Sequence, residues 1–503
     1  MEIPRDYNAA ADLIGRNLAA GRGGKLAYVD DAGRYTFAEL DERVNRFGSG
    51  LQALGLQMED RILIAMHDGI DWPTAFLGAI KAGIIPIAVN TLLTTKDYDY
   101  MLSDSRARAL VVSEALLPQF KPVLEKMPFL KHVLVAPFKD VMNRGQASLK
   151  AAQTTRDDAC FWLYSSGSTG MPKGTVHVHG SLPLTAELYA RGVLGMSESD
   201  TVFSAAKLFF AYGLGNAMTF TLYTGATAVL MAERPTPASV FKRWIERKPS
   251  VFFGVPTLYA AMLASPEFPK KGELALRTCV SAGEALPPQI AKTFKERTGI
   301  DILDGIGSTE MLHIFLSNRP GELRYGTTGK PVPGYELRLV DERGQPVKQG
   351  ELGELEIRGP TAAAYYWNNR EKSRSTFAGA WTKSGDKYSV DADGFYAYGG
   401  RTDDMLKVSG IWVSPAEVEA ALVSHDAVLE AAVIGHEDEQ KLVKPKAYVV
   451  LKPGSAASEA LKSSLQQHVK DRLAPYKYPR WIEFMNDLPK TATGKIQRFK
   501  LRT

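Results

Sequence analysis

The chain has 503 residues and a mass of 55.1 kDa, a length that predicts two or three domains. Hydrophobic residues make up 45% and charged residues 23%, as in soluble globular proteins, and no apolar run approaches the roughly 20 residues of a membrane span. Charged side chains within residues 1–16 predict no signal peptide, and Cys160 and Cys279 lie in apolar runs. We therefore expect two buried free thiols in a cytoplasmic protein with no membrane partner.

The net charge of +5 is concentrated near the carboxyl end of the sequence. The last 34 residues hold nine basic and three acidic side chains, so the other 469 residues carry a net charge of −1. Most of these side chains fit a solvated tail, but a cluster this local also suits a polyphosphate ligand. No nucleic-acid-binding motif accompanies it, so we expect no nucleic-acid partner. The basic residues are Lys470, Arg472, Lys477, Arg480, Lys490, Lys495, Arg498, Lys500 and Arg502.

Strand-like and helical runs alternate through the first 310 residues, and this alternation predicts an α/β fold with layered sheets and helices. After Gly334 the pattern becomes β-rich, and from Asp404 onward it predicts a compact α+β domain of about 100 residues. Ser414 is a predicted helix N-cap, with Pro415 and Glu417 at the first and third helical positions. The expected strands include 60–66, 84–89, 107–113, 131–137, 159–164, 250–256, 276–283 and 353–359, with two strands around a turn in 335–347 and two more in 428–451. The expected helices include 71–83, 257–265, 287–299 and 459–473.

The stretch "YSSGSTGMPKG", Tyr164 to Gly174, gathers glycines, hydroxyl side chains and one lysine between two strand-like runs. Inward-turned amides of such a loop form an anion nest, and Lys173 would add a point charge for a phosphate. The loop is not a P-loop, because Pro172 and Gly174 occupy the glycine and Ser/Thr positions of that motif and a strand follows rather than a helix. The stretch therefore predicts a phosphate-binding loop of another kind.

The glycine-rich stretch resembles the phosphate loop of the adenylate-forming superfamily, which includes acyl-CoA synthetases, peptide-synthetase adenylation domains and firefly luciferase. Further matches follow in the family's order and cover essentially the whole chain: "SAGEAL" (281–286), "DGIGSTE" (304–310), "SGDKY" with Asp386, "GGRTDD" with Arg401, and "PKTATGKIQR" (489–498). The resemblance implies a large ATP- and acid-binding domain over 1–402, with a β-rich subdomain at about 330–400. It also implies a mobile lid domain over 403–503, with its hinge at Asp403.

By this resemblance the protein activates a carboxylate with ATP, forming an acyl-adenylate and pyrophosphate. Glu310 and Thr309 would position Mg²⁺, a hard ion that prefers oxygen ligands, and Lys495 would reach the carboxylate and the α-phosphate as the catalytic lysine. Asp386 would accept the ribose hydroxyls with support from Arg401. The ATP-binding residues so implied are Ser165, Ser166, Gly167, Ser168, Thr169, Gly170, Lys173, Gly283, Glu284, Asp304, Gly305, Gly307, Ser308, Thr309, Asp386, Arg401 and Lys495.

In the second half-reaction the family rotates its small domain about the hinge residue, and the thiol of coenzyme A attacks the adenylate. The stretch "KVSGIWV" (407–413) matches the strand that then lines the pantetheine channel. Small residues there leave room for a narrow chain, although an ordinary turn explains Gly410 about as well. The implied CoA-binding residues are Lys407, Ser409, Gly410 and Trp412, and Lys477 and Arg480 are candidates for the CoA phosphates.

Several stretches resemble the benzoate–CoA ligase branch of the family, among them "IPRDYNAA" (3–10), "KLFFAYGLGN" (207–216) and "MLHIFLSN" (311–318). The resemblance places a flat aromatic acid among Ala211, Tyr212, Gly307, His313 and Ile314. An aromatic wall with small residues at its floor suits a planar ring. Phe209 and Phe210 are also explained as core residues, and His177 and His179 as a strand face rather than a metal pair.

The sequence leaves alternatives open. The preferred acid could be benzoate, 4-hydroxybenzoate, an aminobenzoate or a cyclic carboxylate, because one polar atom in the pocket could accept or reject a hydroxyl. The protein could also belong to another functional class: an adenylation domain that loads a carrier protein, a luciferase-like oxygenase, or a nucleotide-sensing homologue without enzymatic activity. Intact Glu310, Asp386, Arg401 and Lys495 argue against the last. The resemblance also allows a homodimer.

Overall fold

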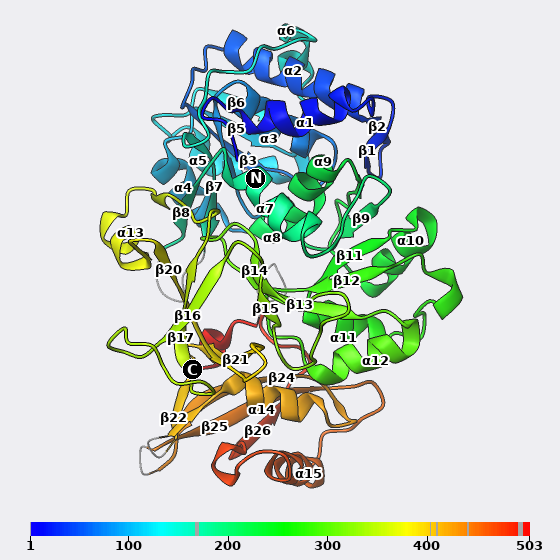
Figure 1. The fold of residues 1–503 in the computed structure, drawn as a ribbon, viewed down its shortest axis with the longest axis vertical. Helices are drawn as coiled ribbons and strands as arrows, with labels where there is room; N and C mark the ends of the chain where they lie inside the picture. The colour runs from blue at the N-terminus through cyan, green and yellow to red at the C-terminus, as the bar shows by residue number, and fades with distance from the viewer. Residues whose placement is uncertain are drawn as a thin grey trace.

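The computed structural model describes residues 2–165, 171–402, 404–408, 411–439, 442–490 and 496–502, with the side chains of Lys407, Ile411 and Trp412 excepted. The amino-terminal elements lie at one end of the molecule and the carboxyl-terminal elements at the other, with the middle of the chain between them (Figure 1). The predicted α/β fold class is confirmed, since layered sheets and helices build most of the described chain.

A seven-stranded sheet in the order β18-β8-β7-β4-β3-β5-β6 carries the glycine-rich stretch at one side. β7, β4, β3, β5 and β6 run parallel, while β8 pairs antiparallel with β7 and β18 antiparallel with β8. β7 ends at Ser165 and β8 begins at Lys173, so the two strands expected on either side of the glycine-rich stretch are present. The strands are β3 Arg61–Ala65, β4 Ile85–Ala88, β5 Ala109–Val112, β6 His132–Val135, β7 Ala159–Ser165, β8 Lys173–Val178 and β18 Tyr365–Tyr366.

A nine-stranded sheet in the order β15-β14-β13-β12-β11-β9-β10-β1-β2 forms the second layer. Its strands from β13 to β1 are parallel, and their carboxyl ends lead to the other predicted motifs. Ligands of α/β sheets bind beyond the carboxyl ends of the strands. The strands are β1 Leu26–Val29, β2 Arg34–Thr36, β9 Thr201–Ser204, β10 Thr227–Val229, β11 Val251–Gly254, β12 Thr278–Ser281, β13 Ile302–Gly307, β14 Ile314–Ser317 and β15 Lys330–Pro331.

Helices cover both sheets and bury a continuous apolar core. Side-chain capping fixes several helix starts. At Thr36 and Thr94 the threonine hydroxyl accepts the N3 amide, and the N3 carboxylate accepts the backbone amide of the threonine. Cys160 and Cys279 are both buried and free, which confirms that prediction. The helices are α1 Ala9–Ala19, α2 Phe37–Ala53, α3 Asp71–Lys81, α4 Thr95–Ser105, α5 Leu117–Leu124, α6 Lys139–Arg144, α7 Ser181–Thr185, α8 Ala211–Leu214, α9 Phe220–Thr224, α10 Pro237–Arg247, α11 Pro256–Ala264, α12 Pro288–Thr298, α13 Arg370–Thr376, α14 Pro415–Val423 and α15 Glu459–Lys470.

A five-stranded antiparallel sheet forms the expected β-rich unit. The prediction of two strands in 335–347 is wrong in one respect: only 336–340 is a strand, and Pro346 makes a single isolated bridge to Val340. The partner of β16 is instead β17, because Pro346 has no amide hydrogen for a ladder. The strands are β16 Glu336–Val340, β17 Gly353–Arg358, β19 Phe377–Ala378, β20 Trp381–Val390 and β21 Tyr396–Arg401.

The carboxyl-terminal part packs α14 and α15 around a three-stranded sheet with its own apolar core. Ser414 caps α14 by accepting the Glu417 amide at 3.2 Å, as predicted. The stretch 407–413 is not one strand, because β22 and β23 pair antiparallel with each other. The proposed boundary residue Asp403 lies outside the described residues. The strands are β22 Leu406–Val408, β23 Ile411–Val413, β24 Val428–Glu437, β25 Val443–Leu451 and β26 Trp481–Phe484.

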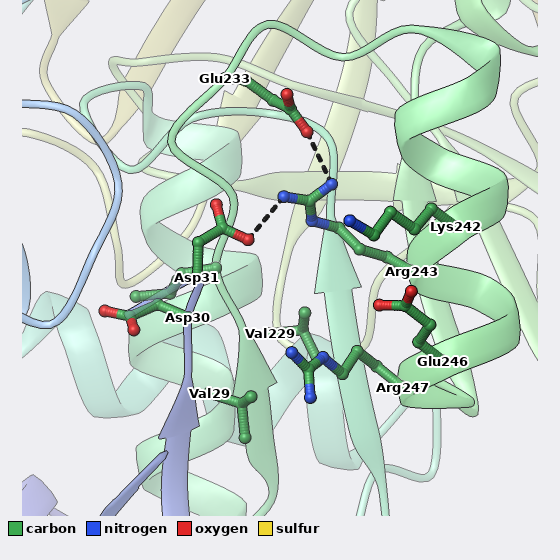
Figure 2. Close-up of a pocket in the computed structure, with 10 residues that line it drawn as sticks. Val29, Asp30, Asp31, Val229, Glu233, Lys242, Arg243, Glu246 and Arg247 are labelled. Atoms are coloured by element: carbon green, nitrogen blue, oxygen red, sulfur yellow. Dashed lines mark hydrogen bonds and ion pairs between the residues drawn. The ribbon is translucent and has the colours of Figure 1, made fainter. Parts of the chain in front are cut away.

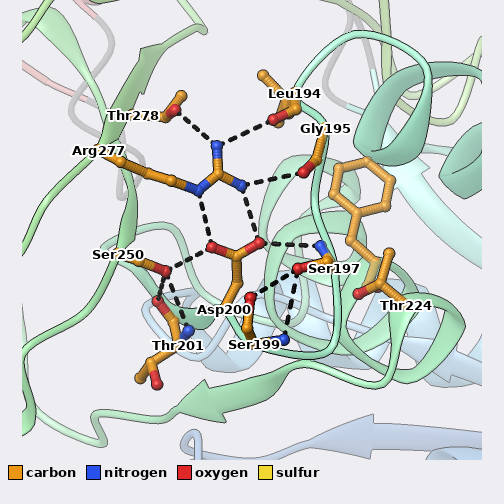
Figure 3. A network of polar contacts seen from close by, with 11 residues as sticks. Leu194, Gly195, Ser197, Ser199, Asp200, Thr201, Thr224, Ser250, Arg277 and Thr278 are labelled. Atoms are coloured by element: carbon orange, nitrogen blue, oxygen red, sulfur yellow. Dashed lines mark hydrogen bonds and ion pairs between the residues drawn. The ribbon is translucent and has the colours of Figure 1, made fainter.

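Two groups of ion pairs, one around the buried Arg243 and one around the buried Asp200, join strands of the nine-stranded sheet. Arg243 of α10 donates to Asp31, just after β1, and to Glu233, just after β10, each at 2.7 Å (Figure 2). Figure 3 shows the second, in which Asp200 and Arg277 form two contacts of 2.8 Å and Ser250 donates to Asp200. Asp200, Ser250 and Arg277 directly precede β9, β11 and β12, so this network joins the amino ends of three adjacent strands.

Replacing Asp200 by alanine is expected to lower the free energy of unfolding by about 2–3 kcal/mol, because Arg277 loses a charge-assisted partner. Burial alone would raise the pKa of the Asp200 carboxyl, but hydrogen bonds from Arg277, Ser250 and Ser197 outweigh it and lower the pKa. The stabilisation is therefore present above the ordinary carboxyl range and is lost as the pH falls below about 4.

Urea unfolding of both proteins between pH 7 and pH 3 measures this effect. The difference between wild type and Asp200→Ala should shrink as the pH falls. A difference that stays constant, or an Asp200→Ala variant as stable as wild type at pH 7, would contradict the role given to this network.

Candidate active site

A cleft of about 1000 Å³ lies between the carboxyl ends of β12 and β13, the β20–β21 pair and the carboxyl-terminal part of the chain. α14 borders it from the carboxyl-terminal side through Glu417 and Glu419. The structure brings together here the predicted ATP-binding residues Gly283, Glu284, Asp304, Gly305, Gly307, Asp386 and Arg401. Ser166, Gly167, Ser168, Thr169, Gly170 and Lys495 lie outside the described residues. The site assignment as a whole stays a prediction.

Asp386 and Arg401 face each other across the β20–β21 pair, where they occupy paired register positions. The Arg401 guanidinium lies 3.2 Å from the Asp386 carboxylate and also donates to the Ser384 carbonyl at 3.3 Å. Gly385 has a φ of +72°, a conformation that lets the chain turn beside the guanidinium. The pair therefore presents a buried carboxylate, held by a cation, at the wall of the cleft.

Asp304 within β13 carries an unsatisfied acceptor. Its Oδ1 has no hydrogen-bond partner among the described residues, although the side chain is buried and lines the cleft. Burial raises the pKa of the Asp304 carboxyl well above its usual range, while the Leu286 and Gly305 amides act in the opposite direction. A buried acceptor without a partner costs free energy unless a ligand donates to it. An N–H donor such as the amino group of adenine fits this position.

Glu310, Tyr366 and Lys173 meet at the end of the glycine-rich stretch. The Tyr366 hydroxyl donates to the Glu310 carboxylate at 2.7 Å, and the Lys173 ammonium lies 4.9 Å from the Tyr366 ring centroid. Burial lowers the pKa of Lys173, while the charge of Glu310 opposes that shift. The structure thus brings the glycine-rich stretch, with Lys173, next to the 304–310 motif, with Glu310. Sequence reasoning missed Tyr366, whose only signal was its place in an aromatic run.

His177 of β8 orients the backbone of the second motif. Its Nε2 lies 2.7 Å from the Thr309 carbonyl, which can only accept, so Nε2 carries the proton. The ring is fully buried, stacks on Phe161 with a centroid distance of 5.3 Å, and burial lowers its pKa to about 4. His179 accepts the Ala9 amide at Nδ1. Within the described ranges no group of three or more His, Cys, Asp or Glu side chains is placed so that it could hold a metal ion.

The residues predicted to hold the acid surround His313. Its Nε2 donates to the Tyr212 carbonyl at 3.2 Å and to Asn216 Oδ1 at 3.0 Å, and burial lowers its pKa to about 3. The rings of Tyr212 and Phe220 lie 5.5 and 4.5 Å from it between centroids. A Cβ at Gly307 would meet the His313 carbonyl oxygen at 2.5 Å, so that position requires glycine. The arrangement is a largely apolar and aromatic cluster around a neutral, buried histidine, and of the acid-pocket candidates Gly307 lines the cleft.

The remaining acid-pocket candidates lie beside this cluster. Ala211 and Tyr212 begin α8, Ile314 begins β14, and Asn216 lies in a short π-helical turn, a feature often found at functional sites. Phe209 is 5% exposed and stacks against Phe210, as the core interpretation predicts. Sequence reasoning missed Asn216 and Phe220, because nothing in the sequence distinguishes them from ordinary core residues.

The CoA candidates are less fully described. Lys407 and Trp412 are register partners in the β22–β23 pair, while Ser409, Gly410 and the hinge candidate Asp403 lie outside the described residues. Lys477 is paired with Glu417 at 2.6 Å, and Arg480 lies 3.6 Å from the centroid of the Tyr478 ring. Lys477 must therefore leave Glu417, or share it, to bind a phosphate.

Two family profiles match this chain. The AMP-binding enzyme profile matches residues 16–367, and the AMP-binding enzyme C-terminal domain profile matches residues 417–495. The chain belongs to the AMP-binding enzyme family. The resemblance stated from the sequence motifs is thereby confirmed.

Within this family the chain is similar to ligases of aromatic acids. It is 64% identical to a benzoate–CoA ligase of Thauera aromatica, over 100% of this chain and 97% of the relative. It is 50% identical to a 4-hydroxybenzoate–CoA/benzoate–CoA ligase of Rhodopseudomonas palustris, over 99% and 94%. A crystal structure of a benzoate CoA ligase from Burkholderia xenovorans LB400 superposes with a TM-score of 0.94 at 56% identity, covering 99% of this chain and 100% of that one.

His177→Phe is expected to slow adenylate formation about 10-fold, because the buried Thr309 carbonyl loses its donor while the stacking on Phe161 is kept. Pyrophosphate release at varied Mg·ATP concentration measures the effect. Full activity in a folded variant would contradict the positioning of the Thr309–Glu310 backbone by His177.

Proposed function

We propose that the chain is an AMP-forming aryl-acid CoA ligase that converts benzoate, ATP and CoA to benzoyl-CoA, AMP and pyrophosphate. The full-length identity of 64% with a benzoate–CoA ligase carries this proposal and bears out the predicted enzyme class, an acid–thiol ligase. The Tyr212 and Phe220 rings next to His313 support a flat aromatic acid. His313 Nε2 is already engaged with Tyr212 and Asn216. A hydroxy- or aminobenzoate is the second candidate, favoured by the similarity to ligases of those acids.

In the first half-reaction, a carboxylate oxygen of the acid attacks the α-phosphorus of ATP, and the bond to pyrophosphate breaks. Both reactants are anions, so catalysis depends on cations and donors placed before the reaction. Lys173 lies beside Glu310 at the phosphate end, and Arg401 with Asp386 would hold the ribose. Lys495, directly before Ile496 in the sequence, would neutralise the carboxylate and α-phosphate.

Magnesium fits this site as a partner of the nucleotide rather than as a resident ion. Glu310 offers one half-buried carboxylate beside Lys173, and the described residues contain no group of acidic and histidine side chains that could bind a metal alone. Mg²⁺ commonly takes one or two carboxylates and completes its shell with phosphates and water. When bound, it would reduce the charge of the phosphates, with Glu310 and Thr309 as its protein contacts.

In the second half-reaction, the sulfur of CoA attacks the acyl carbon of benzoyl-AMP, the thiol proton is lost and AMP leaves. Residues 403–503 would rotate about Asp403 relative to residues 1–402, exchanging Lys495 for the β22–β23 pair at the cleft. Lys407, Ser409, Gly410 and Trp412 would then border the pantetheine chain. We also propose that the boundary between the two domains lies between residues 402 and 403.

A panel of acids tests the proposed substrate. Benzoate should release pyrophosphate and form a thioester faster than hexanoate, with hydroxy- and aminobenzoates between them. Without CoA, turnover should stop after one equivalent of adenylate, and adding CoA should restore it, which a carrier-loading domain without its carrier would not show. Fast turnover of hexanoate with none of benzoate would refute the aryl assignment.

Lys495→Ala should nearly abolish adenylate formation and leave thioester formation from supplied benzoyl-AMP within about 3-fold of wild type, because the lysine acts on charge that develops in the first step alone. Rapid-quench assays of each half-reaction measure both rates. Equal losses in the two steps would refute the alternating use of the small domain.

A further inference from the structure

One hydrogen bond links the adenine-side motif of the large domain to the segment that carries the predicted catalytic lysine. The backbone amide of Ile496 donates to the Glu284 carboxylate at 2.6 Å. Glu284 follows β12, whereas Ile496 is the residue directly after Lys495 in the sequence. The bond is charge-assisted and short, so it is among the stronger kinds of hydrogen bond in proteins. A carboxylate of one domain thus contacts the main chain next to the predicted active lysine.

The carboxyl-terminal part of the chain contacts Ile496 and its neighbour Gln497 on its own side. Lys490 and Ile496 form an antiparallel bridge, and the Gln497 amide donates to the Pro489 carbonyl at 2.7 Å. Lys490 also forms ion pairs of 2.7 Å with Glu430 and Asp487. The two ends of the segment are therefore joined and fixed to β24. A contact at Ile496 is consequently transmitted to the small domain as a whole.

Charge favours the same contact. Arg498 lies two residues after Ile496 and binds Glu419 of α14 through two contacts, of 3.0 and 2.7 Å. Burial alone would lower the pKa of the Arg498 guanidinium, but the Glu419, Glu284 and Asp404 carboxylates together hold it above its ordinary value. Arg498 thus binds Glu419 of its own domain and also attracts Glu284, which lies across the cleft. Removing the Glu284 charge would weaken both the hydrogen bond and this attraction.

We propose that Glu284 is a positioning residue that docks the Lys495 segment on the large domain during adenylate formation and releases it for the thioester step. This inference rests on the proposed function of Lys495. Glu284 acts through the Ile496 amide and the Arg498 charge, so its carboxylate stabilises one arrangement of the two domains. Losing it raises the free energy of the adenylate-forming arrangement and leaves that of the other unchanged, so the population shifts towards the other arrangement, as expected when an interaction exists in only one of two states.

A role in binding ATP predicts a different outcome, because Glu284 also belongs to the predicted ATP-binding set. A direct contact with the nucleotide would act whether or not Lys495 is present. Docking of the Lys495 segment would affect adenylate formation only when Lys495 is present, because docking acts by bringing that lysine to the cleft. The two roles are therefore separated by combining Glu284→Ala with Lys495→Ala.

The experiment measures both half-reactions in the full-length protein, for Glu284→Ala, Glu284→Gln, Lys495→Ala and the double variant Glu284→Ala/Lys495→Ala. Glu284→Ala should slow adenylate formation about 10-fold, and Glu284→Gln less, since its amide oxygen still accepts from Ile496. Both Glu284 variants should form the thioester from supplied benzoyl-AMP within about 2-fold of wild type. In the Lys495→Ala background Glu284→Ala should cause no further loss. Glu267→Ala, an exposed carboxylate after α11, serves as control and should match wild type.

Any other outcome would overturn the docking role of Glu284, the proposed function of Lys495, or both. A full 10-fold loss from Glu284→Ala in the Lys495→Ala background, or equal losses in both half-reactions, would overturn the docking role while leaving the proposed function intact. Wild-type adenylate formation by Glu284→Ala would do the same. Wild-type adenylate formation by Lys495→Ala would overturn the proposed function of Lys495 and the docking role with it.

Discussion

Repulsion between anions is the constraint on which the proposed chemistry depends. A carboxylate and a triphosphate have to approach within bonding distance, and the interaction between like charges is strong in a site from which water is excluded. The large domain answers this with Lys173 beside Glu310 and with Arg401 beside Asp386, each cation partly compensated by a carboxylate. The account adds one further cation, Lys495, supplied by a separate domain. A cation brought from outside can also be withdrawn once the adenylate has formed.

Different contacts hold the nine-stranded sheet and the cleft. Ion pairs of Arg243 and Asp200 join strands of the nine-stranded sheet, and His177 ties β8 to the Thr309 backbone. At the cleft, the Ile496 amide donates to Glu284, and the Arg498 guanidinium is attracted to Glu284 and Glu419. Under the proposed rotation, the contacts of Glu284 with the carboxyl-terminal part of the chain would exchange. The proposed acid and nucleotide walls would then stay in place while Lys495 is withdrawn.

Sequence reasoning grouped residues that depend on residue type in a short motif. It predicted Asp386 with Arg401 as a pair and grouped Tyr212 with His313, and the structure brings the members of each group together, while their roles stay predictions. It missed Tyr366, which reaches Glu310 only because β18 pairs with β8. It also read 407–413 as one strand, since two short paired strands and one long strand share the same alternation. Contacts made by distant pairing leave no local signal.

The distance between residues 1–402 and residues 403–503 in each half-reaction most directly tests whether the small domain rotates between the two steps. Spin labels at Glu267→Cys and Asp426→Cys, both exposed positions, report it by double electron–electron resonance, because Cys160 and Cys279 are buried. The account predicts one distance with ATP and benzoate bound and a different one with AMP and CoA bound. A single distance distribution under both conditions, in a labelled enzyme that still turns over, would contradict it.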